Sequence, residues 1–181
     1  MHTMKSIPVK WIVLPGIVFV CVLVTLSHIF YEWSGHLSFV GLFSPVNESV
    51  WEHMKLLFFP MLLYTVYVYF TFRTSIPFIQ SILFAGILVG TFLIPTLFYT
   101  YSGILGKHIA AVDIAIFYVS VLCAFMTVTI LLKNLESIAS SCEPAYLVLV
   151  KVLLAAAIVL LFIGFVVFTD NPPALGIFKA P

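Results

Sequence analysis

Charged residues are scarce in this sequence. Asp, Glu, Lys and Arg make up 8% of its 181 residues, whereas an ordinary soluble domain contains roughly 25%. Hydrophobic residues make up 63%, which is more apolar surface than a soluble globule of this size could hide from water. The scarcity of charge therefore excludes a soluble globular domain and indicates a chain whose natural solvent is lipid.

Two further absences narrow the function. The sequence has no polybasic tract and a formal net charge of only +1, so nothing in it favours binding to nucleic acid. It also has only three cysteines, which form no CxxC pair: Cys21, Cys123 and Cys142. Two of them lie inside apolar runs, so we interpret them as small hydrophobic residues without redox or metal chemistry.

In place of charge, the chain has five long apolar runs. Each is about 20 residues long, which lets a helix cross a hydrocarbon core roughly 30 Å thick. The runs are apolar throughout and lack the alternation of a membrane β-strand. We therefore expect an all-α integral membrane protein in contact with the lipid bilayer. Its single domain, residues 1–181, would be a bundle of five transmembrane helices at roughly 11–31, 50–72, 76–99, 109–132 and 146–168.

The positions of lysine and arginine predict the orientation of the bundle. Cytoplasmic segments carry an excess of these residues, and the first helix usually has the greatest weight. Both basic residues that flank the first run, Lys5 and Lys10, precede it. We therefore expect a multi-pass protein of the cell membrane, with a cytoplasmic N-terminus and an extracytoplasmic C-terminus.

The acids and histidines gather toward one end of the expected bundle. Antiparallel packing brings the end of the first helix, the start of the second, the end of the third and the start of the fourth to one face. The first helix ends with His28 and Glu32, four residues apart and hence on one side of it. The second and fourth helices add their own polar residues to this face: Glu48, Glu52, His53, Lys55, His108 and Asp113.

The start of the second helix is the densest polar segment. Asn47 is its expected N-cap residue, because an asparagine side chain can accept a hydrogen bond from the first turn. Glu48, Glu52 and Lys55 follow at helical spacing and share one face. Since an unpaired ammonium group inside a membrane is costly, we expect Lys55 to pair with one of these two glutamates. His53 projects about 100° around the helix from Glu52.

Residues 47–55 have the sequence Asn-Glu-Ser-Val-Trp-Glu-His-Met-Lys. Together with residues 28–33 and 94–101, this segment resembles a family of small, uncharacterised multi-pass membrane proteins of Gram-positive bacteria. The resemblance covers most of the chain. It implies a bacterial membrane protein, and it assigns no catalytic residue because that family has no established biochemical function. The His-x-x-x-Glu pattern of residues 28–32 is also similar to the sterol-isomerase-like membrane fold.

One interpretation of the polar residues is a divalent-metal site, for zinc or a similar ion, in a hydrolase-like intramembrane enzyme acting on a lipid-like or small-molecule substrate. The expected metal ligands are His28, Glu32, His53, His108 and Asp113. The expected catalytic residues are Glu48, Glu52 and Lys55. The sequence contains no HExxH motif, so these ligands would have to meet across separate helices.

A second interpretation is a small proton- or cation-coupled transporter. Buried carboxylates and histidines would bind the ion, with Lys55 as their counter-charge. Five helices enclose only a narrow pathway, so a homodimer would be needed. Gly86 and Gly90, four residues apart in the third helix, offer a close-packing face for a second copy.

Two metal-free interpretations use the same residues. In one, His28 and a glutamate transfer protons during the isomerisation of a lipid-like substrate. In the other, the polar side chains bind no substrate and form a network that holds the helices together.

Overall fold

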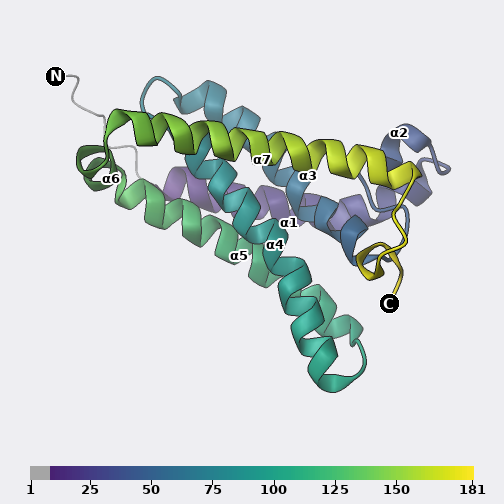
Figure 1. The fold of residues 1–181 in the computed structure, drawn as a ribbon. Helices are drawn as coiled ribbons and strands as arrows, with labels where there is room; N and C mark the ends of the chain where they lie inside the picture. Colours follow the sequence, from purple (N-terminus) through teal and green to yellow (C-terminus); the bar gives the residue numbers. More distant parts are fainter. Residues whose placement is uncertain (1–8) are drawn as a thin grey trace.

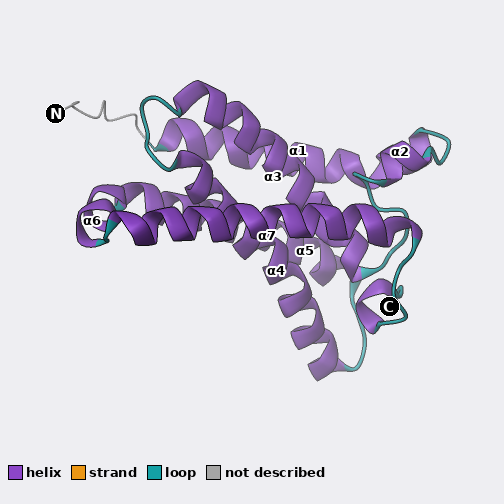
Figure 2. Ribbon diagram, turned by 45° about the horizontal axis from the view of Figure 1, so that its top comes forward, coloured by secondary structure: helices purple, strands orange, loops and turns teal. Residues whose placement is uncertain are grey.

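The computed structural model describes residues 9–181, and the secondary structure of this part of the chain is entirely helical (Figures 1 and 2). Five helices among the described residues are long and apolar enough to cross a membrane. They are α1 (Lys10–Trp33), α3 (Val50–Phe72), α4 (Ile79–Leu105), α5 (Ala110–Lys133) and α7 (Pro144–Asp170). The short helices α2 (Ser38–Gly41), α6 (Leu135–Ser141) and the 3₁₀ helix η1 (Gly176–Phe178) lie in the connections and the C-terminal segment. The expected all-helical membrane fold is confirmed.

The long helices do not form a uniform parallel bundle. In both views α7 lies along one side of the molecule, and α4 and α5 form a hairpin whose joined end projects away from α1 and α3 (Figures 1 and 2). The start of α1 and the end of α7 lie at opposite ends of the molecule, as an odd number of spans requires. Which end is cytoplasmic stays a prediction, and Lys5, one of the two residues on which it rests, lies outside the described residues.

The bounds of α4 differ most from those expected. It begins at Ile79, because Phe78 has a left-handed backbone conformation with φ 58° that interrupts the helix. It then continues to Leu105, past the expected end at residue 99. The helix stops at Gly106, whose φ of 68° is the left-handed conformation that only glycine adopts without strain. The extension places Tyr101 on a helix next to the start of α5.

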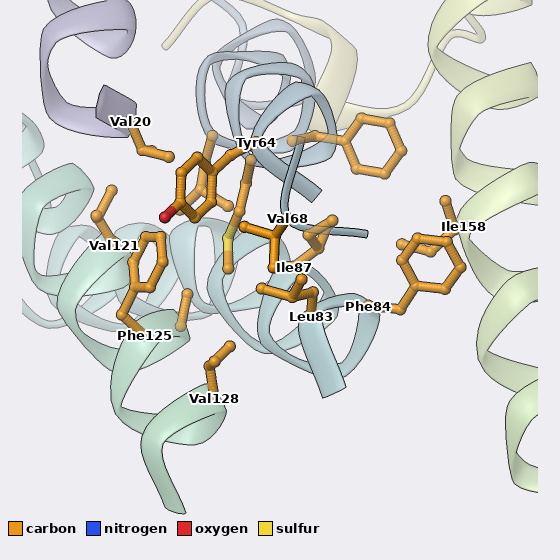
Figure 3. Close-up of a cluster of buried hydrophobic side chains, with 14 of the residues drawn as sticks. Val20, Tyr64, Val68, Leu83, Phe84, Ile87, Val121, Phe125, Val128 and Ile158 are labelled. Carbon is orange, nitrogen blue, oxygen red and sulfur yellow. The ribbon is translucent and has the colours of Figure 1, made fainter. Parts of the chain in front are cut away.

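The core is centred on α3, which packs against α1 and α4, and its Tyr64 side chain also reaches Phe125 of α5, with ring centroids 6.0 Å apart. Figure 3 shows how side chains from different helices meet there, with Tyr64 and Val68 of α3 near Leu83 of α4 and Phe125 of α5. The hydroxyl of Tyr64 donates to the backbone carbonyl oxygen of Ile12 at 2.6 Å. This bond ties α3 to the start of α1 and satisfies a polar group inside an apolar core.

Gly86 and Gly90 allow α4 and α5 to approach closely. A Cβ atom on Gly86 would lie 2.7 Å from a methyl group of Val128 and 2.9 Å from the carbonyl oxygen of Ala124. A Cβ atom on Gly90 would lie 2.9 Å from the Ala124 side chain. The glycine face offered by the sequence for a second copy is therefore filled by α5 of the same chain. A homodimer stays a prediction, and this face cannot be its contact surface.

Candidate functional site

The start of α3 is set by two hydrogen bonds before the helix. Ser49 is the N-cap residue, and its hydroxyl accepts from the backbone N–H of Glu52 at 3.3 Å. The prediction of Asn47 as the N-cap is wrong. Its Oδ1 accepts from the backbone N–H of Ser49 at 2.9 Å, and this bond lies in the turn that precedes the helix. Glu48 consequently precedes the helix and does not share a helical face with Glu52 and Lys55.

Glu48 instead turns toward two histidines. Its Oε2 atom lies 3.2 Å from Nε2 of His53 in the first turn of α3 and 4.0 Å from Nε2 of His28 near the end of α1. One potential ligand atom from each of the three residues lies within 4.8 Å of the others. The side chain of His53 is 17% exposed, that of His28 46% and that of Glu48 68%. The group therefore lies where water can reach it.

The orientation of the His53 ring is fixed by the backbone. Its Nδ1 atom lies 2.8 Å from the carbonyl oxygen of Ser49. A carbonyl oxygen can only accept, so Nδ1 carries the proton and donates it to this bond. In the neutral ring, Nε2 then presents a lone pair toward the carboxylate of Glu48, which is also an acceptor. Two acceptors at this distance need a shared proton, or a cation that both of them coordinate.

Two imidazole nitrogens and one carboxylate are a ligand set suited to a divalent transition metal. Catalytic zinc sites use three such protein ligands and keep a fourth position for water. Zinc bonds of 2.0–2.2 Å in tetrahedral geometry place ligand atoms about 3.3–3.6 Å apart. The 3.2 Å between His53 and Glu48 is close to that separation, and the 4.0 Å between His28 and Glu48 requires only a small side-chain rotation.

The group lies in the wall of a cavity of about 810 Å³ between α1, α3, α4 and α5. Ala180 and Pro181 of the C-terminal segment also line it. The ionisable side chains of its lining are His28, Glu48, His53, His108 and Asp113. Most of the remaining lining is apolar and includes Val24, Leu56, Ile94, Phe98, Ile116 and Phe117.

A second polar group in this cavity contains His108 and Asp113. Nδ1 of His108 donates to Oδ2 of Asp113 at 3.4 Å, and the hydroxyl of Tyr101 donates to the other carboxylate oxygen. The Tyr101 hydroxyl also accepts from the backbone N–H of Ile109 at 3.0 Å. Asp113 is thus held by α4 and the connection before α5, and it orients the His108 ring so that Nε2 is free for proton transfer.

Phe117 lies between the two polar groups, next to His53 and one helical turn from Asp113. The ring centroids of Phe117 and His53 are 5.7 Å apart. Asp113 precedes Phe117 by one turn of α5, which is about 6 Å along the helix axis. A small molecule in the cavity can therefore contact both the His53 group and the His108–Asp113 pair.

Glu52 and Lys55 form a separate, fully buried network. Their side chains are 2% and 0% exposed, and Nζ of Lys55 donates to Oε2 of Glu52 at 2.7 Å. The same ammonium group donates to the carbonyl oxygen of Gly41 at 3.0 Å and to the hydroxyl of Thr169 on α7. Oε2 of Glu52 also accepts from the backbone N–H of Val46 at 3.1 Å. All three donors of the lysine are used, which leaves no free proton for chemistry.

The structure therefore divides the predicted site residues. It brings together His28, Glu48 and His53, and it places His108 and Asp113 as a pair in the same cavity. Glu52 and Lys55 do not line the cavity, and the catalytic role expected for them stays a prediction. Glu32 is exposed and also lies outside the cavity lining, because it is one turn beyond His28 on α1.

Two residues of the site were not singled out by the sequence. Ser49 stands three residues before Glu52, which is the Ser-x-x-Glu spacing of a helix N-cap, so a signal for it was present. No sequence pattern linked Tyr101 to Asp113, because their contact depends on the extension of α4 and the turn that follows it.

Comparison with known families places the chain in a family and assigns it no activity. A family of unknown function (DUF6512) has a model that matches residues 1–181. The chain belongs to this family. The DUF6512 assignment confirms that the chain belongs to a family without an established function, and the bacterial origin implied by the resemblance stays a prediction. Neither a curated protein nor a solved structure matches the chain.

Proposed function

We propose that this DUF6512 protein is a divalent-metal-dependent enzyme of the cell membrane, of hydrolase type, with the metal bound by His28, Glu48 and His53. The observation that carries the proposal is the arrangement of His53. Its Nδ1 donates to a backbone carbonyl oxygen, and its Nε2 faces a carboxylate oxygen at 3.2 Å. Metal-binding histidines are commonly oriented by such a bond from the second ring nitrogen.

The reaction follows from the second polar group. A zinc-like ion held by His28, Glu48 and His53 would supply an activated water, because such an ion lowers the pKa of bound water to about 7. His108, oriented by Asp113, would accept the proton of that water at Nε2. The oxygen of the water that gives its proton to His108 would form a bond to the carbonyl carbon or phosphorus atom of the substrate. The leaving oxygen would depart with the electron pair of the broken bond and take the proton from His108, so that one water molecule is consumed.

The location of the cavity supports a substrate that is at least partly lipid-like. Four membrane-spanning helices line it, and most of its wall is apolar. With the cytoplasmic N-terminus that Lys5 and Lys10 favour, the polar end of the cavity would lie on the extracytoplasmic side.

The test is metal dependence of both binding and hydrolysis. Protein purified in dodecyl maltoside would be stripped with a chelator, and then titrated with Zn²⁺, Mn²⁺, Fe²⁺ or Co²⁺. We expect one tightly bound ion per chain, and turnover of a chromogenic fatty-acyl ester or alkyl phosphoester only when the metal is present. A folded chain that binds none of these ions would overturn the metal centre. A metal-loaded chain that cleaves neither probe would overturn the hydrolase assignment.

A further inference from the structure

We infer that the cavity binds a single-chain amphiphile with an oxyanion head group, of the phosphate or carboxylate type. The head group would occupy the open position of the metal, and the hydrocarbon chain would lie along the apolar wall. This inference rests on the proposed function, because the oxyanion is bound through the metal.

The first argument is the division of the cavity lining along the helices. On α1, His28 lies near the end of the helix and Val24 lies one turn deeper, about 6 Å along the axis. On α5, Asp113 lies near the start of the helix and Phe117 lies one turn deeper. The cavity is thus polar at the level of the helix ends and apolar farther into the bundle. A ligand that satisfies both parts must itself have a polar end and an apolar end.

The second argument is the size and position of the cavity. Its volume of about 810 Å³ is in the upper part of the roughly 300–1,000 Å³ range of small-molecule sites. The hairpin of α4 and α5 diverges from α1 and α3 toward the end where α3 begins and α7 ends, as both views show (Figures 1 and 2). The polar lining residues belong to this end. The volume of the cavity gives room for a hydrocarbon chain as well as a head group.

The third argument is charge. The side chains that face the cavity include two carboxylates, Glu48 and Asp113, and three histidines, His28, His53 and His108. Without a metal, the carboxylates favour a cationic ligand. A divalent cation neutralises them and leaves an open coordination position that takes an oxygen donor. The preferred sign of the head group should therefore depend on whether the metal is bound.

The experiment uses the full chain with Co²⁺ bound, in digitonin, a detergent without an alkyl chain that could compete with the probes. The visible absorption of Co²⁺ changes when its ligands change. Dodecyl phosphate, inorganic phosphate and dodecyltrimethylammonium are titrated separately. We expect dodecyl phosphate to produce a saturable spectral change at a concentration at least tenfold lower than inorganic phosphate. Dodecyltrimethylammonium should produce none and should not compete.

Each alternative result is decisive. Equal potency of inorganic phosphate would show a plain oxyanion site without a role for the apolar wall. Competition by dodecyltrimethylammonium would overturn selection for an anionic head. A Co²⁺ spectrum that no probe alters would overturn this inference while leaving the metal centre in place. Failure to bind Co²⁺ at all would overturn the proposed function and this inference with it.

A pair of matched variants distinguishes binding of the ligand's hydrocarbon chain from binding of its head group. Thr25 on α1 lines the cavity and is exposed, and its hydroxyl bonds only to the backbone carbonyl oxygen of Cys21. Thr71 on α3 makes the same kind of bond to Tyr67 and lies outside the cavity lining. Thr25→Trp should weaken dodecyl phosphate binding at least tenfold and leave the inorganic phosphate response unchanged. Thr71→Trp should alter neither, and the Co²⁺ spectrum reports whether each variant keeps an intact site.

Discussion

Nε2 of His53 faces the carboxylate of Glu48 at 3.2 Å, and the opposite nitrogen of the same ring donates to the carbonyl oxygen of Ser49 at 2.8 Å. The first contact supplies two ligand atoms, and the second decides which ring nitrogen has the free lone pair. Because Ser49 is also the N-cap of α3, the geometry of the site is set by the same residue that starts the helix. The orientation of the His53 ring therefore depends on the formation of the first turn of α3.

Replacing the carboxylate ligand should remove most of the metal affinity. Glu48→Gln keeps the shape of the side chain and deletes its charge, so we expect the dissociation constant for Zn²⁺ to rise by about 100-fold or more. The side chain is 68% exposed, so the thermal unfolding temperature of the chelated protein should not change. Calorimetric titration of the purified protein with Zn²⁺ measures the dissociation constant. Thermal unfolding in detergent measures the unfolding temperature.

Glu32→Gln is the matched control for this measurement. It deletes the same charge from an exposed glutamate near the same end of the bundle, outside the cavity lining. Zn²⁺ affinity should stay within about twofold of the unaltered protein, since the Glu32 side chain is exposed to water, where a charge that is not a ligand acts only weakly on the metal. If both variants lost affinity equally, Glu48 would not be distinguished from Glu32, and the assignment of Glu48 rather than Glu32 as the carboxylate ligand would be overturned.

Asp113→Asn should separate metal binding from proton transfer. In the structure Asp113 contacts His108 and Tyr101, and it is not part of the three-residue metal group. We therefore expect unchanged Zn²⁺ stoichiometry. Because His108, the proposed general base, loses the carboxylate that orients it, kcat for ester or phosphoester hydrolysis should fall by up to about 10²–10⁴-fold, the usual contribution of such a base. Loss of the metal in Asp113→Asn would show instead that the aspartate is a ligand, as the sequence predicted.

The fold was largely predictable because membrane solvation leaves few choices. A chain of apolar runs about 20 residues long must satisfy its backbone within each span, and helices do so. The bounds were less predictable where backbone geometry decides them. The left-handed residues Phe78 and Gly106 move both ends of α4 away from the positions indicated by hydropathy alone.

The grouping of the site residues was only partly predictable. Placing the acids and histidines at one end of the bundle required only the topology. Their division into separate groups depended on where α3 begins, because a start at Val50 leaves Glu48 outside the helical face of Glu52 and Lys55. Successive residues of a helix point about 100° apart, so an error of about one residue in the helix start changes which side chains share a face. A hydropathy pattern does not locate a helix start to within one residue.

The Glu52–Lys55 pair should contribute to stability and not to catalysis. Glu52→Gln leaves a fully buried ammonium group without its counter-charge, so we expect the free energy of unfolding to fall by about 3–5 kcal/mol. The double variant Glu52→Leu with Lys55→Met removes both charges and should recover most of that loss. Thermal unfolding in detergent compares the three proteins.

The same double variant tests the catalytic role predicted for this pair. The network also holds Val46, two residues before Glu48, through the Glu52 carboxylate. We therefore expect reduced Zn²⁺ affinity, with kcat retained at saturating metal. Abolished hydrolysis in a folded, metal-saturated double variant would show that Glu52 or Lys55 takes part in the reaction.

Two glycines of α4 should respond in opposite ways to the same substitution. Gly86→Ala adds a Cβ atom 2.9 Å from the backbone carbonyl oxygen of Ala124, which cannot move without displacing α5. We expect a loss of about 1–3 kcal/mol in the free energy of unfolding, as for other overpacked cores. Gly103→Ala meets nothing within 4 Å and should gain about 0.5–1 kcal/mol from helix propensity.

Thermal unfolding of Gly86→Ala and Gly103→Ala under identical detergent conditions measures the two changes in stability. Equal gains would mean that α4 and α5 are farther apart in the bilayer than the structure places them. In that case the glycine face would again be free for a second copy, and cross-linking of single-cysteine variants on α4 would report it. A loss confined to Gly86→Ala fixes the α4–α5 hairpin as one packed unit, which is the condition for Tyr101 on α4 to hold Asp113 on α5.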